Sequence, residues 1–196
     1  MSEQLLLVMS LVLAYGLGSI PFGLLFTRWA GQGDIRDIGS GNIGATNVLR
    51  TGNKLVALLT LLADAAKGFV AVMVAWRLAG DNAAAMAALA SLIGHIFPVW
   101  LTFKGGKGVA VFIGTMLMLS PLAGLNFLLL WIVVAIIGRR SSLAAIIAFL
   151  ATPALLYVLG EMVTMQVSLV MVAISLWAHK ENISRLLSGT EPKIGQ

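Results

Sequence analysis

The sequence predicts an all-α polytopic membrane protein that forms one domain over residues 1–196. Of its 196 residues, 59% are hydrophobic and only 11% are charged, which is too apolar for a soluble globular domain. A bilayer core of roughly 30 Å needs about 20 apolar residues per helix, and the chain supplies several such runs. Basic residues also gather in alternate connections between the runs, as the positive-inside bias requires. We therefore expect about seven transmembrane helices, with the N-terminus outside and the C-terminus in the cytoplasm.

Seven apolar runs are candidates for these helices. The first run lacks the basic segment of a signal peptide and is too long for its apolar region, so we expect it to be retained. The fourth run is short for a straight crossing, and Pro121 obscures its boundary with the fifth, so five or six crossings remain possible. The runs are 4–29, 54–79, 83–102, 109–120, 122–138, 142–159 and 163–178.

The orientation follows from the distribution of lysine and arginine. With the N-terminus outside and alternating crossings, eleven of the thirteen basic residues lie in inner connections, whereas Arg77 lies outside and Lys67 within a run. Every polar, motif-like stretch then faces the cytoplasm. The eleven are Arg28, Arg36, Arg50, Lys54, Lys104, Lys107, Arg139, Arg140, Lys180, Arg185 and Lys193.

Residues 103–109 form a basic, glycine-rich loop between two apolar runs, which we call the glycine loop. Three glycines and two lysines within five residues let the backbone approach an anion beside two positive charges. The following helix would add its N-terminal donors. The loop is not a Walker motif, because Lys107 is followed by glycine instead of Ser or Thr. The alternative is a flexible turn with basic flanks. The candidate phosphate ligands are Lys104, Gly105, Gly106, Lys107 and Gly108.

Residues 39–50 form a second polar stretch, in which glycines alternate with hydroxyl and amide side chains before Arg50. This composition suits an anion or a polyol, and an arginine can hold a phosphate with two parallel hydrogen bonds. Long loops in compact proteins are usually functional, although an ordinary polar loop is the alternative. The candidate ligands are Ser40, Asn42, Gly44, Thr46, Asn47 and Arg50.

Residues 179–186 form a third polar stretch after the last apolar run. If the helix continues, His179, Asn182 and Arg185 share one face, because they recur every three residues. A histidine is suited to proton transfer near neutral pH, while the other two side chains could bind a phosphate. The alternative is an amphipathic tail on the membrane surface.

Helix N-termini and intramembrane charges complete the candidate site. Three helices would begin at the cytoplasmic face, and the sixth opens with two arginines and two serines, so a serine cap such as Ser142 could offer its hydroxyl to a ligand. Asp64 and Lys67 lie three residues apart and are expected to pair inside the bundle, with direct catalysis as the alternative. His95 could bond within the bundle or reach the site. The chain has no cysteine and two histidines, so we expect neither a Cys-bound nor a histidine-rich metal site; we also expect no cofactor, and the sequence leaves open whether a metal assists phosphate binding.

The three polar stretches together resemble a known family. Residues 39–50, Gly94 and His95 with 103–109, and 179–185 followed by Gly189 and Glu191 are similar to the three cytoplasmic motifs of the PlsY family. Members are bacterial membrane acyltransferases that transfer an acyl group from acyl phosphate to glycerol-3-phosphate. The resemblance covers nearly the whole chain and implies seven helices.

The resemblance also implies roles for particular residues. Ser40 and Arg50 would be essential, the glycine loop would hold the phosphate of glycerol-3-phosphate, His179 and Asn182 would serve catalysis, and Glu191 would be structural. The products would be 1-acyl-glycerol-3-phosphate (lysophosphatidic acid) and phosphate, as the first acylation of phospholipid synthesis. We expect direct transfer without an acyl-enzyme, because the donor is already activated.

The same resemblance sets the expected partners and location. Membrane lipid and an upstream enzyme that forms acyl phosphate are the expected partners, and no nucleic acid is. The expected location is the bacterial inner membrane, with the active site at the cytoplasmic face. The alternative function is a membrane transporter or channel for a phosphorylated metabolite, for which the charges at Asp64 and Lys67 would also be natural.

Overall fold

The computed structural model describes residues 2–194, and every regular element within them is a helix. This confirms the predicted all-α class. The α-helices are α1 Glu3–Gly18, α2 Phe22–Trp29, α3 Ala45–Val48, α4 Lys54–Ile96, α5 Val109–Leu119, α6 Pro121–Gly138, α7 Ser141–Val158, α8 Met162–Ala178 and α9 Lys180–Leu187. Three short 3₁₀ helices are η1 Ile35–Asp37, η2 Leu49–Thr51 and η3 Val99–Leu101.

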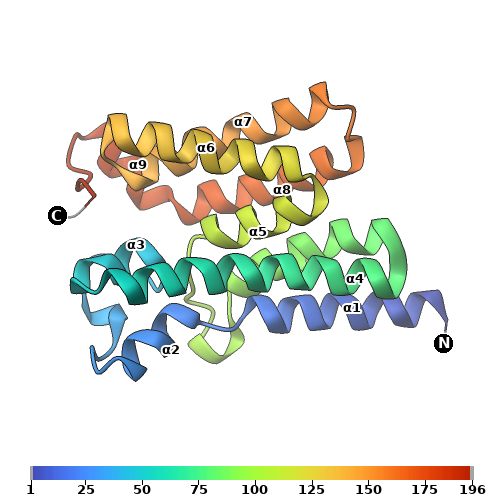
Figure 1. Cartoon of the computed structure of the whole chain (residues 1–196), viewed down its shortest axis with the longest axis horizontal. Coiled ribbons are helices and arrows are strands. Elements are labelled where there is room, and N and C mark those ends of the chain that lie inside the picture. The colour runs from blue at the N-terminus through green and yellow to red at the C-terminus, as the bar shows by residue number, and fades with distance from the viewer. Residues whose placement is uncertain (1, 195–196) are drawn as a thin grey trace.

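Helix α4 is a hairpin of two antiparallel arms. Ala79 and Gly80 have non-helical backbone angles, and Gly80 has φ 78°, a left-handed conformation that glycine adopts without strain. The side chains of Lys67 and His95 meet at 2.9 Å although they are 28 residues apart. A straight helix would separate them by roughly 42 Å. The chain therefore reverses at residues 79–80, as Figure 1 shows, into a first arm (54–78) and a second arm (81–96).

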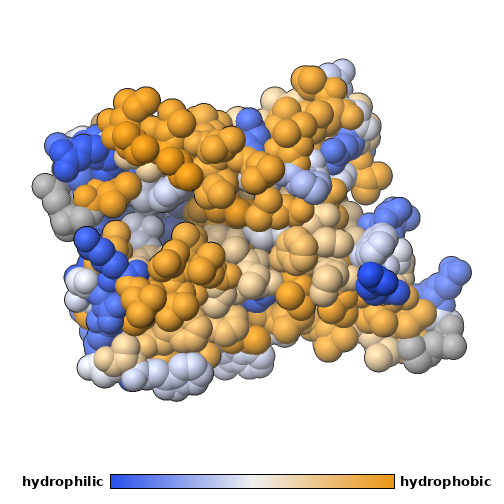
Figure 2. All heavy atoms as spheres, in the orientation of Figure 1, coloured by the Kyte–Doolittle hydropathy of each residue, from blue (hydrophilic) through white to orange (hydrophobic). Residues whose placement is uncertain are grey.

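The helices suit a membrane by length and composition. Within residues 2–194, four segments can span one, namely Glu3–Trp29, Lys54–Leu101, Pro121–Gly138 and Ser141–Val158, and a fifth exists if α8 and α9, bent by 64°, count together. The second of these segments contains both arms of α4. Apolar residues cover the middle of the visible face and hydrophilic residues gather toward its ends (Figure 2). The exact number of crossings and the direction of insertion stay predictions.

The predicted helix boundaries differ from the structure in two places. The run 4–29 is divided at residues 19–21, because Pro21 cannot donate a helical hydrogen bond. The run 83–102 ends at Ile96, since the residue before Pro98 is pushed out of the helical region. The last helix bends after Ala178. The ends of α5, α6, α7 and α8 lie within one residue of the predicted ends.

Small residues let the N-terminal helices pack closely. A side chain on Gly18 of α1 would overlap the backbone of Ser91 in the second arm, and one on Gly114 of α5 would overlap the backbone of Ala65 in the first arm. Close backbone approach through small residues is the usual way in which membrane helices associate. Helices α1, α4 and α5 thus form one compact group.

A cluster of aromatic rings joins α5 to the C-terminal helices. Phe112 of α5, Phe127 of α6 and Phe149 of α7 lie with their ring centroids 4.9–5.2 Å apart. The His179 ring lies 5.9 Å from that of Phe149. Figure 1 shows α5 between α4 and the C-terminal helices α6, α7 and α8, with α3, α9 and the C-terminus at the end opposite to the N-terminus. The apolar core therefore reaches the end where the polar stretches gather.

Candidate active site

The glycine loop is attached to the end of the second arm of α4. The N–H groups of Gly105 and Gly106 donate to the carbonyls of Ile96 and His95, both at 3.0 Å. The Lys104 N–H donates to Leu101. These three N–H groups are bonded to carbonyls and are not available to an anion in this arrangement, and phosphate binding by the loop stays a prediction. A phosphate would instead meet the Lys107 side chain and the start of α5, where Gly108 is the N-cap residue.

Lys107 joins the glycine loop to the third polar stretch. Its ammonium donates to the Oδ1 atom of Asn182. Burial lowers the pKa of Lys107, and the positive charges of Arg185 and Arg50 lower it further, while Glu191 opposes them. Lys107 therefore lies within electrostatic range of charges from both other polar stretches.

Glu191 connects the C-terminal segment to α7 and α9. Its Oε1 atom accepts hydrogen bonds from the Ser142 hydroxyl and the Asn182 amide, both at 2.6 Å, and Oε2 accepts from Arg185 Nε at 2.7 Å. Burial raises the pKa of the Glu191 carboxyl, but these three hydrogen bonds outweigh burial and hold the pKa below its usual range. We call Glu191, Ser142, Asn182, Arg185 and Lys107 the Glu191 network.

Asn47 organises the first polar stretch. Its Oδ1 atom accepts from the Ser40 N–H at 3.0 Å, the Ser40 hydroxyl at 3.3 Å and Arg50 at 3.3 Å. The side chain is buried, and both of its polar atoms form hydrogen bonds within residues 35–50. This favours a supporting role over the predicted contact with substrate. Its amide nitrogen donates to the carbonyls of Ile35, Ile38 and Asn42.

The other predicted ligands of this stretch lie at its surface. The Asn42 side chain accepts from the Gly44 N–H at 2.9 Å and fixes the turn before α3. The Ser141 hydroxyl donates to that of Thr46 at 3.3 Å, which joins the stretch to the start of α7. Ser40 and Lys104 are exposed. The three polar stretches therefore meet through Thr46, Ser141 and the Glu191 network.

His179 and Ser142 differ from their predicted geometry. The chain bends by 64° between α8 and α9, so His179 does not share a continuous helical face with Asn182 and Arg185. His179 is buried, with Nδ1 2.7 Å from the Ser175 carbonyl. A carbonyl only accepts, so Nδ1 carries a proton and Nε2 of the neutral ring is free to act as an acceptor. Ser142 is not a helix cap, because Arg140 occupies that position and the Ser142 hydroxyl bonds Glu191.

The two intramembrane acid and base residues pair as predicted. Lys67 Nζ lies 2.7 Å from Asp64 Oδ1, and both side chains are buried. His95, also buried, lies 2.9 Å from the same ammonium and adjoins the glycine loop. His95 thus bonds within the bundle and reaches the site.

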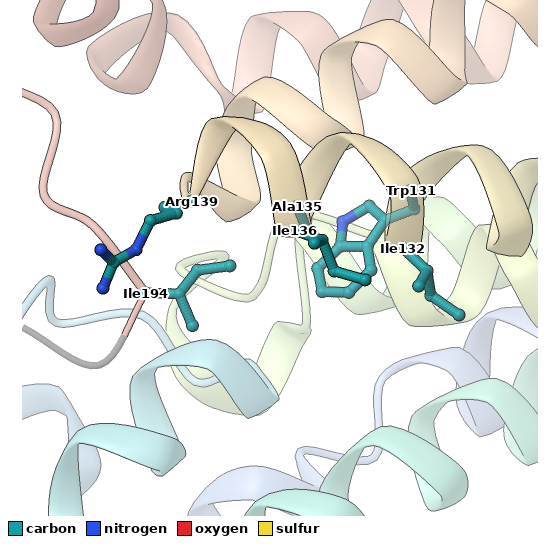
Figure 3. Close-up of a pocket in the computed structure, with 6 residues that line it drawn as sticks. All are labelled: Trp131, Ile132, Ala135, Ile136, Arg139 and Ile194. Atoms are coloured by element: carbon teal, nitrogen blue, oxygen red, sulfur yellow. The ribbon is translucent and has the colours of Figure 1, made fainter.

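An apolar groove beside the polar stretches was not predicted. It has a volume of about 420 Å³ and follows α6, with Arg139 at its polar end and Ile194 of the C-terminal segment beside it (Figure 3). The Ile194 N–H donates to the Arg139 carbonyl at 2.7 Å. Groove-facing and lipid-facing residues of α6 are equally apolar, so the sequence carried no signal for it. The lining residues are Trp131, Ile132, Ala135, Ile136, Arg139 and Ile194.

Metal binding has no obvious site. Within residues 2–194, no group of three His, Cys, Asp or Glu side chains is placed to hold an ion. The charged groups near the glycine loop are mostly cations, which attract phosphate and repel metal ions.

Comparison with known proteins gives a consistent result. Residues 8–189 match the glycerol-3-phosphate acyltransferase family. The chain is 56% identical to the glycerol-3-phosphate acyltransferase of Agrobacterium fabrum, covering 97% of this chain and 93% of the relative. It is 53% identical to that of Bradyrhizobium diazoefficiens, covering 100% and 99%.

Solved structures agree with this match. A crystal structure of PlsY, an integral membrane glycerol 3-phosphate acyltransferase in its glycerol 3-phosphate form, superposes with a TM-score of 0.91 at 37% identity, covering 96% of both chains. The lysophosphatidic acid form of that protein superposes with a TM-score of 0.89 at 36% identity, covering 95% of this chain and 94% of the other.

Proposed function

The chain belongs to the glycerol-3-phosphate acyltransferase family, and from this premise we propose that it transfers an acyl group from acyl phosphate to glycerol-3-phosphate. The products are lysophosphatidic acid and inorganic phosphate. The observation that carries the proposal is the meeting of the three polar stretches around Lys107, beside an apolar groove. The substrates carry both phosphate groups and an acyl chain, so their site must place a cationic region next to an apolar one.

The acceptor phosphate binds where positive charge is in excess. Arg185 and Arg50 both lie within electrostatic range of Lys107. Glu191 neutralises only part of this charge, so a dianionic phosphate is attracted to the same place. Asn182 is held by Glu191 and Lys107, which keeps its amide in a fixed position beside the bound phosphate.

The donor chemistry needs positioning and charge neutralisation more than a nucleophile. An acyl phosphate is a mixed anhydride, so the glycerol hydroxyl can attack its carbonyl carbon directly while the bond to phosphate breaks. The hydroxyl proton passes to the leaving phosphate or to His179 Nε2. Exposed Lys104 neutralises charge on the departing phosphate.

Ser40 is a hydrogen-bond donor in this scheme. A serine nucleophile requires a base within hydrogen-bonding reach and an orienting partner for that base. The Ser40 hydroxyl contacts the Asn47 amide oxygen, which is not a general base. Acyl transfer is therefore direct, with no acyl-enzyme.

The groove along α6 holds the acyl chain. Its walls are apolar except at Arg139, so a chain can lie along α6 with its phosphate end toward the cations. The groove also opens beside the lipid-facing side of α6, where Ile136 and Ile137 are exposed. The donor can therefore enter from the membrane.

Turnover by the purified protein tests the proposal. In detergent, acyl phosphate and glycerol-3-phosphate should yield lysophosphatidic acid and phosphate in equal amounts, while an acyl thioester should yield neither. Turnover with the thioester alone would contradict the proposed donor. Acyl phosphate labelled in its acyl group, supplied without acceptor, should leave no label on Ser40; stoichiometric label with a burst of phosphate would contradict direct transfer.

We propose that the site faces the cytoplasm of a bacterial inner membrane. The chain has no native cysteine, so single cysteines report topology cleanly. In intact cells, an impermeant thiol reagent should label a cysteine at exposed Asn82 and should spare cysteines at exposed Gly41 and Ser184. Labelling at either inner position would overturn the orientation.

A further inference from the structure

We propose that Asp64, Lys67 and His95 form a positioning unit, the buried triad, that sets the place of the glycine loop and thereby of Lys107. The inference rests on the proposed function in one respect, the binding of the acceptor phosphate at Lys107. It goes beyond that function because it assigns a task to three buried side chains that do not touch substrate.

Lys67 is fixed in place by three acceptors. An ammonium has three hydrogens, and the Lys67 ammonium lies 2.7 Å from Asp64 Oδ1, 2.9 Å from His95 Nδ1 and 2.7 Å from the Ile20 carbonyl. These acceptors come from the first arm, the second arm and the segment after α1. The ammonium therefore ties three parts of the chain together at one point.

The same contact fixes the His95 ring. An ammonium can only donate, so His95 Nδ1 is the acceptor and Nε2 carries the proton of the neutral ring. The ring is buried and cannot turn without breaking this bond. Lys67 thus determines both the tautomer and the orientation of His95.

The glycine loop rests on this ring. A methyl group built on Gly106 would overlap His95 at Nε2, with Cε1 and Cδ2 also within 3 Å. The carbonyl of His95 accepts from the Gly106 N–H at 3.0 Å. Side chain and backbone of one residue therefore support the loop immediately before Lys107, and Gly106 is required because nothing larger fits above the ring.

A positioning role also explains why position 64 and position 67 carry charged side chains inside the bundle. A buried ion pair is no more stabilising than apolar residues of the same shape, because desolvation offsets the attraction. Asp64 and Lys67 therefore contribute little net stability by being charged. Their role is to orient the His95 ring, because a leucine or methionine at position 67 could not bond Nδ1 and the ring would be free to turn under the loop.

A double-mutant cycle between Gly106 and His95 tests the proposal. Gly106→Ala should raise the KM for glycerol-3-phosphate by roughly tenfold. A change of this size lies within the range of coupling energies between residues in direct contact. In a His95→Ala background the added methyl has room, so the same change should raise KM much less. Additive effects on KM would overturn the proposal.

Two substitutions at His95 test whether the residue positions the glycine loop or only fills space beneath it. Glutamine places its terminal amide near the position of Nε2, whereas asparagine places its amide near Nδ1. His95→Gln should therefore retain a lower KM for glycerol-3-phosphate than His95→Asn, at comparable melting temperatures in detergent. Equal KM values for the two variants and the parent would contradict a positioning role, and these variants serve if His95→Ala does not fold.

Lys107→Met distinguishes failure of this inference from failure of the proposed function. A raised KM in Lys107→Met, together with parental KM values in the His95 variants, would sink the positioning role alone. An unchanged KM in Lys107→Met would overturn both. A raised KM in Lys107→Met, a non-additive Gly106 cycle and the glutamine and asparagine difference together support the proposal.

Discussion

Two polar networks in this molecule, the buried triad and the Glu191 network, each combine a carboxylate with a lysine, but they have opposite roles. In the buried triad, the Lys67 ammonium forms an ion pair with Asp64 and hydrogen bonds with the His95 ring nitrogen and the Ile20 carbonyl. In the Glu191 network, one carboxylate accepts hydrogen bonds from Ser142, Asn182 and Arg185, while Lys107 donates to the amide oxygen of Asn182. Positive charge is balanced in the first network and in excess in the second.

The difference shows that the partners of a lysine, and not its presence in an apolar chain, decide what it does. Lys67 is buried, whereas Lys107 is half-buried at the polar end of the molecule. A balanced network resists change and supports its surroundings, whereas a network with excess charge attracts an anion. The following substitutions test this contrast.

Breaking the buried triad should have the largest effect. Lys67→Met leaves Asp64 buried without its partner, and removing one member of a buried ion pair costs about 3–5 kcal/mol. Thermal unfolding in detergent measures the loss. The double variant Asp64→Leu/Lys67→Met removes both charges and should be more stable than Lys67→Met alone; equal or lower stability would show that the pair is not balanced as described.

Glu191→Gln should have the next largest effect. In this variant the amide nitrogen of glutamine faces a group that donated a hydrogen bond to the carboxylate. A charge-assisted hydrogen bond such as that from Arg185 is lost, which lowers the free energy of unfolding by about 1.5–3 kcal/mol. Unfolding in detergent measures the change, and Glu181→Gln, at an exposed position of α9, is the control and should be nearly neutral. Equal losses in the two variants would remove the central role of Glu191.

The apolar groove offers a smaller test. Ala135→Leu narrows it, and we expect the KM for a long-chain acyl phosphate to rise roughly fivefold, equivalent to about 1 kcal/mol. The KM for glycerol-3-phosphate should be unchanged. The matched control is Ile137→Leu on the lipid-facing side of the same helix, where 79% of the residue is exposed. An equal response of both variants would show that the chain binds elsewhere.

The pH dependence of acceptor binding should change least. Because the pKa of Lys107 is lowered by burial and by Arg185, its charge is complete at low pH and is lost at a lower pH than that of an ordinary lysine. The KM for glycerol-3-phosphate should therefore rise a few-fold at a lower pH than the titration of an ordinary lysine would produce. In Lys107→Arg the alkaline rise should disappear, since arginine stays charged; an identical rise in both proteins would assign it to another group.

Much of the fold followed from the sequence, because a bilayer dictates the length and apolarity of its helices. The ends of α5 to α8 were predicted within one residue, and Asp64 and Lys67 were predicted to pair because they lie three residues apart. The bend at His179 was not predicted, because no proline or glycine marks it.

Long-range features of the site were less accessible. The part of His95 in the buried triad depends on a chain reversal that brings together residues 28 apart. The occupied N–H groups of Gly105 and Gly106 depend on carbonyls at the end of the second arm. The groove could not be distinguished from lipid-facing surface, because both are apolar. In each case the missing information was which distant atoms become neighbours.

Equilibrium binding of glycerol-3-phosphate to the purified protein tests the central claim most directly. The claim is that excess positive charge at Lys107, outside the balanced triad, holds the acceptor phosphate. We expect Lys107→Met to bind glycerol-3-phosphate at least roughly tenfold more weakly than the parent protein, because a charge-assisted hydrogen bond to the phosphate is lost. Equal affinity of the parent and the variant would contradict the account.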